Sequence, residues 1–344
     1  MIYAYALLAI AAAIITDRVR KPYVVRIVLT VLGLLLVLVP TLDPSEATRN
    51  LLADAAIYAA LALGLNVVIG FAGLLDLGYA AFFAIGAYAY GMFASPQFGL
   101  HVPFWVILLL AGPLAALFGM LLGAPTLRLR GDYLAIVTLG FGEIVPQIFQ
   151  NLTAYTGGPN GIPGLDVPSF FGHSFGASAL PFYYLALGLV VLAIVISRNL
   201  RASRLGRAWM AIRDDEVAAK HAGIDTTRAK LAAFAIGASF SGCAGVLFAA
   251  KLGLVSPDLF GFQVSVLIVS MLVLGGMGNL SGVVVGSIVL SLLNSAVLPQ
   301  ANTLIATIFH INVDLSQYHF ALYGIILVAM MLIRPAGLLA RSSR

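Results

Sequence analysis

Long apolar segments follow one another along most of the chain, separated by short polar stretches. The segments 51–69, 104–123 and 182–197 carry no charged side chain apart from Asp54. Crossing the hydrocarbon core of a bilayer takes about 20 apolar residues. Only helices and closed barrels satisfy their backbone hydrogen bonds in lipid, and the alternating pattern of barrel strands is not seen here. The pattern therefore predicts an all-α, polytopic transmembrane helical bundle.

The same pattern sets the expected helices and the number of spans. We expect about eight to eleven spans, because the first helix is short and the segments 77–95 and 262–277 are candidates for re-entrant segments. We treat 1–344 as a single transmembrane domain, and we expect no cleaved signal peptide because the start of the chain lacks a basic region. The helices are expected at 2–16, 24–39, 51–69, 77–95, 104–123, 133–150, 181–197, 231–250, 262–277, 282–298 and 319–333.

Composition agrees with a membrane protein and offers no enzymatic site. The chain is 61% hydrophobic and 10% charged, with a mean hydropathy of +1.02, far from a soluble globular domain. A single cysteine, Cys243, excludes an internal disulfide. We expect no catalytic residue, metal or cofactor, and the sequence contains no GxxxxGK[ST] motif for ATP. The five histidines lie in separate segments without ligand spacing: His101, His173, His221, His310 and His319.

Basic residues are distributed unevenly over the predicted loops. With the N-terminus outside and the C-terminus cytoplasmic, only Arg49 and Lys251 of the nineteen basic residues fall outside. The positive-inside rule predicts this asymmetry. The net charge of +5 then follows from cytoplasmic loops, and no nucleic-acid partner is needed. The other seventeen basic residues lie in the four segments predicted to face the cytoplasm, 17–26, 124–132, 198–230 and 334–344.

The cytoplasmic segment 198–230 holds eight of the nineteen basic and four of the fourteen acidic residues. Within it we expect a short helix, with Asp214 as its N-cap and Asp215 and Glu216 in its first turn. Gly223 fits a left-handed C-terminal cap. Two hypotheses stand side by side: a rigid docking surface for a soluble partner, or an amphipathic helix on anionic membrane lipid.

Several motifs carry a family resemblance. The stretch "SRLGRAWMAIRDDEVAAKHAGIDTTRAKLAAFAIGASFSGCAGVLFA" closely resembles the signature loop and following helix of branched-chain amino acid ABC importer permeases, more narrowly the LivM-type subunit. Together the similar segments cover most of 60–340 in family order. The others are "LGLNVVIGFAGLLDLGYAAFFAIGAYAYG", "LRGDYLAIVTLGFGEIV", "TGGPNGIPG", "VLGGMGNLSGVVVG" and "IRPAGLL".

The resemblance implies partners as well as a fold. In that family the loop docks into a cytoplasmic ATPase, a second related permease completes the transmembrane unit, and a periplasmic or extracellular solute-binding protein delivers the solute. The implied solutes are leucine, isoleucine and valine, with urea, other amino acids and aromatic acids as alternatives. The implied location is a bacterial or archaeal plasma membrane. The docking loop corresponds here to 205–223, with motif positions at Gly206, Arg207, Asp215, Glu216, Ala219 and Gly223.

The chain also departs from the family's pattern. It carries Asp76 and Tyr79 where members commonly have Ser and His. It carries Pro146 after "FGEIV" where they commonly have Arg. These differences affect the region where a solute would pass, so they bear on the substrate and leave the architecture unchanged.

A solute pathway is expected near Glu143. A charge at mid-bilayer costs roughly 3 kcal/mol or more, so this carboxylate should face protein or water and not lipid. The alternative is a structural carboxyl bonded to a neighbouring helix. Asn66 and Asp76 belong to a second polar region, which glycines interrupt, and both are further candidates for the pathway. The alternative for Asp76 is a position at the cytoplasmic membrane interface, outside the pathway. An ion-coupled secondary transporter using Glu143 and Asp76 remains the competing function.

Small residues recur every fourth position in two predicted helices. Gly237, Ser241 and Gly245 give one such series, and Gly282 and Gly286 another. This spacing is typical of closely packed membrane helices.

Overall fold

The computed structural model describes residues 45–126, 132–170, 173–176, 178–300, 302, 318–334 and 337–338. The helices expected at 2–16 and 24–39 lie outside these residues. Within the described part, six helices are long and apolar enough to cross a membrane, and three shorter apolar helices accompany them. The predicted all-α bundle of membrane-spanning helices is therefore confirmed.

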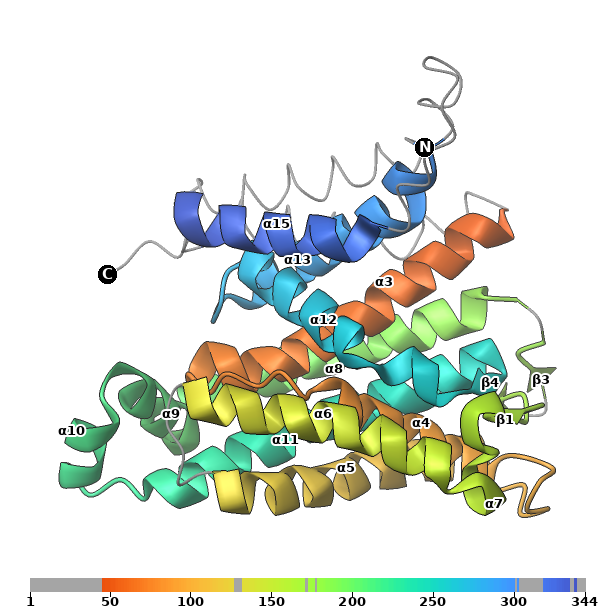
Figure 1. Ribbon diagram of the computed structural model, residues 1–344, viewed down its shortest axis with the longest axis horizontal. Helices are drawn as coiled ribbons and strands as arrows, with labels where there is room; N and C mark the ends of the chain where they lie inside the picture. The colour runs from red at the N-terminus through yellow and green to blue at the C-terminus, as the bar shows by residue number, and fades with distance from the viewer. Residues whose placement is uncertain are drawn as a thin grey trace.

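The helix α11 (Thr226–Leu252) packs against α3, α4 and α5. The helices α12 and α13 pack on α3, and α15 packs on α12, on the side of the bundle away from α5 (Figure 1). The helix bounds are α3 Glu46–Leu65, α4 Ala80–Phe93, α5 Phe104–Thr126, α6 Asp132–Asn151, α8 Leu180–Ala202, α12 Phe262–Gly275, α13 Leu280–Leu292 and α15 His319–Ile333.

Small residues allow α11 to approach its neighbours closely, as predicted from their spacing. A Cβ on Gly242 would lie 2.6 Å from the Cβ of Ala115 on α5. A Cβ on Gly245 would lie 2.8 Å from the backbone nitrogen of Ala87 on α4. A larger side chain at either position would separate the helices, so these residues are part of the packing.

The region 66–93 is an interrupted helix followed by a short buried one. The helix α3 continues as a π-helix, η1 (Asn66–Phe71), and the chain then turns before α4 begins at Ala80. The fourteen residues of α4 rise only about 21 Å, less than the roughly 30 Å of a hydrocarbon core. The segment 77–95 was a candidate for a re-entrant segment, and this helix is short for a full crossing. A second π-helix, η4 (Leu293–Val297), extends α13.

The two ends of the bundle carry different structures (Figure 1). At one end two short helices, α9 (Arg204–Asp214) and α10 (Glu216–His221), project from the body. The other end is irregular and contains short strand pairs. There β1 (Ile162–Pro163) pairs antiparallel with β4 (Leu254–Val255), and β2 (Ser169–Phe170) with β3 (His173–Ser174), near α7 (Thr153–Thr156), η2 (Gly158–Asn160) and η3 (Pro257–Phe260).

The two basic residues that were expected on the outside lie at the strand-bearing end. Arg49 is in the first turn of α3 and pairs with Glu46 at 2.8 Å. Lys251 is in the last turn of α11, just before β4, and pairs with Asp54 at 2.6 Å. The eight basic residues of 198–230 lie on the segment that includes α9 and α10.

Candidate functional site

The charged segment folds into a pair of helices, which we call the hairpin (residues 203–223). Ser203 caps α9, its Oγ accepting from the backbone N–H of Gly206 at 3.3 Å. Asp215 caps α10, its Oδ1 accepting from Val217 and Ala218 at 2.8 and 3.0 Å. The prediction of Asp214 as the cap was wrong, because Asp214 is still the last residue of α9 and only Asp215 has the extended backbone of a cap.

Two side chains fasten the hairpin to the start of α11. Trp209 is completely buried, and its Nε1 donates to the carbonyl of Ala229 at 2.6 Å. The Nζ of Lys230 lies 2.6 Å from Oε1 of Glu216, and the Lys230 side chain is only 4% exposed. Both helices of the hairpin are therefore held against the same part of α11.

Three of the six family motif positions maintain the shape of the hairpin. Gly206 is buried, and a Cβ there would lie 2.6 Å from the Cα of Arg201. Ala219 is also buried. Gly223 has φ +86°, the left-handed conformation that glycine adopts at least cost, so its expected place just after the helix end is confirmed.

The other motif positions are more exposed, but their polar groups already have partners. Asp215 provides the cap, and Glu216 is paired with Lys230. Arg207 is exposed, and its Nη1 donates to the carbonyl of Ala202 at 2.8 Å. The outer surface of α10 is formed instead by Val217, Ala218, Lys220 and His221, all exposed.

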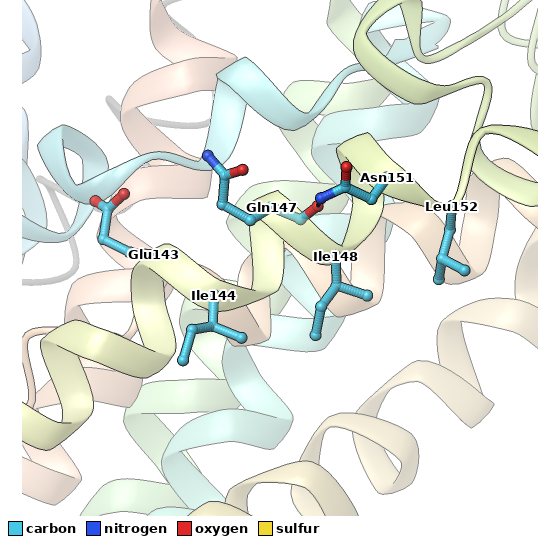
Figure 2. Close-up of a pocket in the computed structure, with 6 residues that line it drawn as sticks. All are labelled: Glu143, Ile144, Gln147, Ile148, Asn151 and Leu152. Carbon is cyan, nitrogen blue, oxygen red and sulfur yellow. Dashed lines mark hydrogen bonds between the residues drawn. The ribbon is translucent and has the colours of Figure 1, made fainter.

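Glu143 lies on the outer face of α6, where it lines a shallow hollow of about 440 Å³. Figure 2 shows that Glu143, Gln147 and Asn151 project to one side of the helix. Ile144, Ile148 and Leu152 project to the other. We call these two rows the polar row and the apolar row; each repeats every four residues and so runs along one helix face.

Glu143 is exposed and has no hydrogen bond or ion pair with any residue that the structure describes. It is also central in the candidate span Tyr133–Asn151. The alternative of a carboxyl bonded to a neighbouring helix is therefore not seen in the described part of the chain. An ionisable group midway along a candidate span is therefore exposed on the bundle surface, where contact with lipid would be costly.

Asn66 and Asp76 are buried away from this face. Oδ1 of Asn66 accepts from the backbone N–H of Gly278 at 2.8 Å, and Oδ1 of Asp76 accepts from Gly78 at 2.9 Å. The Asn66 Nδ2 and the Asp76 Oδ2 have no partner among the described residues. The segment after Asp76 packs directly on α6, because a Cβ on Gly142 would lie 2.8 Å from the Cα of Gly78. The three predicted pathway residues thus do not form one open site in this conformation.

Comparison with known proteins decides the family. Residues 47–333 match the sequence profile of the family described as "Branched-chain amino acid transport system / permease component". The chain belongs to this permease family. It is 42% identical over 317 residues to the high-affinity branched-chain amino acid transport system permease protein LivM of Escherichia coli, covering 86% of this chain and 70% of LivM. The corresponding protein of Salmonella typhimurium is 43% identical over 305 residues, covering 82% and 68%.

The permease is also similar to a second permease protein that is named for the same transport system. It is 27% identical to the Escherichia coli permease protein LivH over 301 residues, covering 83% of this chain and 91% of LivH. No solved structure matches the permease. The family assignment and the apolar helices together make it a multi-pass membrane permease.

Some residues that shape the permease's hairpin were not identified from the sequence. Trp209 and Lys230 were not singled out, although a large aromatic side chain within a charged segment is a signal of local burial. Arg213 was recognised only as one of eight basic residues, yet its Nη1 donates to the carbonyl of Gly70. That contact joins positions 143 residues apart, and no periodic pattern predicts it.

Proposed function

We propose that the chain is the LivM-type permease subunit of an ATP-driven importer of branched-chain amino acids. The observation that carries the proposal is the preformed hairpin at one end of the bundle, opposite the strand-bearing end (Figure 1). Family membership and the 42% identity to LivM support the substrate class.

In this proposal the outer surface of the hairpin is where a cytoplasmic ATPase docks. Val217 is 50% exposed, and Ala218 and Lys220 next to it are also exposed. Their backbone is fixed by the Asp215 cap and by the attachment to α11, so little conformational entropy is lost on docking. The hairpin is therefore suited to transmit force from a partner, and 198–230 is the coupling loop of a single permease domain.

The outer face of α6 is proposed to line the solute pathway together with the second, LivH-like permease. A protein partner would remove the outward-facing carboxylate of Glu143 from lipid. The polar row matches the charged end of an amino acid, with Glu143 beside the ammonium group, and the apolar row matches its aliphatic side chain. Asn66 and Asp76 lie behind this face and join the pathway only after the helices move.

Orientation follows from the charge distribution. In a bacterial or archaeal plasma membrane, the hairpin end and the C-terminus face the cytoplasm, and the N-terminus lies on the outer side. The strand-bearing end then faces a solute-binding protein. Its backbone is held by the pairing of β1 with β4, which joins the segment after α6 to the end of α11.

The test uses proteoliposomes containing the permease, its partner permease, the ATPases and the binding protein. We expect leucine uptake that requires ATP and falls roughly tenfold in Ala218→Arg, since a charge placed in a docking interface costs about 1.4 kcal/mol or more. Ala154→Arg is the matched control for ATPase docking alone, because Ala154 is an exposed helical alanine at the other end: the ATPase should co-purify with Ala154→Arg as with wild type, and less with Ala218→Arg.

Two outcomes would overturn the proposal. Uptake that ignores ATP and follows an imposed proton or sodium gradient would establish an ion-coupled transporter. Equal amounts of co-purified ATPase in Ala218→Arg and Ala154→Arg would contradict docking at the hairpin. ATP hydrolysis by the assembled complex without leucine uptake would agree with an ATP-driven importer and would exclude leucine as its substrate.

A further inference from the structure

The end of the hairpin's first helix is bonded to the interrupted membrane helix. Arg213 is in the last turn of α9, and its Nη1 donates to the carbonyl of Gly70 in η1. The last four carbonyls of a helix have no partner within that helix. Neighbouring carbonyls in η1 are satisfied by turns, with Gly73 donating to Ile69 and Leu74 to Val68. Arg213 supplies the donor for Gly70 from another part of the chain.

A third segment meets the same point. The backbone N–H of Gly278, in the turn between α12 and α13, donates to Oδ1 of Asn66 at 2.8 Å. A Cβ on Gly70 would lie 2.7 Å from the nitrogen of Gly278. A Cβ on Gly278 would lie 3.3 Å from Nη1 of Arg213. The end of α9, the π-helix η1 and the turn 276–279 therefore converge; we call Arg213, Gly70, Asn66 and Gly278 the junction.

Arg213 is exposed overall, but its stem also contacts a second segment. A Cβ on Gly73 would lie 2.8 Å from Cγ of Arg213, so the turn after η1 rests on the arginine stem. Arg201 adds a further contact, with its guanidinium carbon 5.9 Å from the centre of the Phe71 ring and its Nη1 3.5 Å from the carbonyl of Gly278. Arg213 therefore links α9 to these segments, and Arg201 links the end of α8 to them.

The flanking structures differ in rigidity. The hairpin is anchored by the buried Trp209 and by the ion pair between Lys230 and Glu216. By contrast, η1 is a π-helix, a conformation common at functional sites and at helix bends. The turn 276–279 contains Gly276 and Gly278, both with positive φ. The hairpin thus contacts both segments through Arg213, while Arg201 contacts them from the end of α8.

We propose that Arg213 is the positioning residue that transmits movement of the hairpin to η1 and to the turn 276–279, so that α3 and the α12–α13 pair move with the ATPase. The inference rests on the proposed function. It adds a defined route from the docking surface to the interrupted helix that carries Asn66. A purely structural role, in which Arg213 only caps the end of η1, would stabilise the fold without affecting coupling.

The test is the number of ATP molecules hydrolysed per leucine transported, measured for wild type and Arg213→Met. Methionine keeps an unbranched apolar stem against Gly73 and removes the donor and the charge. We expect assembled complexes with ATP hydrolysis near the wild-type rate and uptake roughly tenfold lower, as for loss of one charged hydrogen bond. The ratio then rises roughly tenfold. Arg213→Lys, which retains the cation, should restore part of the uptake.

Arg228→Met is the matched control, because the side chain of Arg228 is 89% exposed and pairs with Asp225 three positions before it on the same helix start. Its ratio should equal that of wild type. An unchanged ratio in assembled Arg213→Met complexes, or a parallel fall of uptake and hydrolysis, would overturn the inference.

Hydrogen exchange on the purified permease gives a second readout that needs no transport. Arg213→Met should speed exchange of the amides in 66–79 and 276–279, while the hairpin amides in 204–223 stay as protected as in wild type. Unchanged exchange at both segments would contradict the proposed route. If wild type itself shows no ATP-dependent uptake, the proposed function fails, and the exchange experiment still reports on the junction.

Discussion

The hairpin and the outer face of α6 both place polar side chains at the surface of an apolar bundle, but they treat them in opposite ways. In the hairpin, Asp215 caps a helix, Glu216 pairs with Lys230, and Arg213 bonds to Gly70. On α6, Glu143 is exposed without a partner in the described part of the chain. The hairpin is complete within one chain, whereas the α6 face requires something outside it.

This difference separates two kinds of partner contact. A surface that is already rigid can receive a soluble partner and return to its free form between cycles. A face with an unpaired carboxylate at mid-membrane depth needs permanent protein or water beside it, since exposure to lipid costs roughly 3 kcal/mol or more. In the proposed function, the hairpin is the surface where the ATPase docks, and the outer face of α6 is the surface that the second permease covers.

Removing the Trp209 side chain should have the largest effect on the hairpin. Trp209→Ala deletes a completely buried side chain and its hydrogen bond to Ala229, so we expect the opening free energy of 204–223 to fall by about 3–5 kcal/mol. Hydrogen exchange of these amides measures it. Trp209→Phe keeps most of the bulk and should lose less; equal protection in wild type and Trp209→Ala would show that the hairpin does not depend on this anchor.

Breaking the Lys230–Glu216 pair should have the next largest effect. Glu216→Leu leaves a buried ammonium group without its carboxylate and should cost about 3 kcal/mol in the same exchange experiment. Adding Lys230→Met should recover most of this loss. If the double variant is as unstable as Glu216→Leu, the pair is not what holds α10. A charge reversal at Glu216 would therefore disturb the fold as well as any docking.

Glu143→Gln should affect transport and leave the hairpin unchanged. The substitution removes the charge from the α6 face at nearly constant volume, and we expect leucine uptake to fall roughly tenfold, about 1.4 kcal/mol. Glu143→Asp retains the charge and should keep more of the uptake. Wild-type uptake in Glu143→Gln would remove this carboxylate from the pathway.

Lys251→Met should have the smallest effect. Lys251, whose side chain is 11% exposed, pairs at the strand-bearing end with Asp54, whose side chain is 36% exposed and which solvent still reaches when the lysine is removed. Partly exposed ion pairs contribute at most about 1 kcal/mol, so exchange near the start of α3 should change little. A fall in opening free energy as large as that in Glu216→Leu would show that the ion pairs at the two ends do not differ in strength.

Much of the architecture could be predicted because it rests on local composition. Apolar length identified α5, α8 and α11, and the four-residue spacing of Gly237, Ser241 and Gly245 predicted close packing of α11. The break after Asn66 was expected from its glycines. Left-handed Gly223 was also predicted, since few other residues adopt φ +86° at low cost.

The remaining features depend on contacts between distant segments. Asp215 and not Asp214 is the cap, because α9 extends through Asp214. The helix α9 is itself anchored by its Trp209, which bonds to Ala229 of α11. The bond between Asn66 and Gly278 joins positions 212 residues apart. Such pairings follow from how the helices pack, which a linear pattern of apolar positions does not encode.

The central claim is tested most directly by site-specific cross-linking in the assembled transporter. Cys243 is replaced by alanine, and single cysteines are placed at Val217 on α10 and at Ile144 on α6, both exposed. We predict that Val217→Cys cross-links to the ATPase and Ile144→Cys to the second permease. Cross-links from Val217 that reach only lipid, or from Ile144 that reach no protein, would contradict the account.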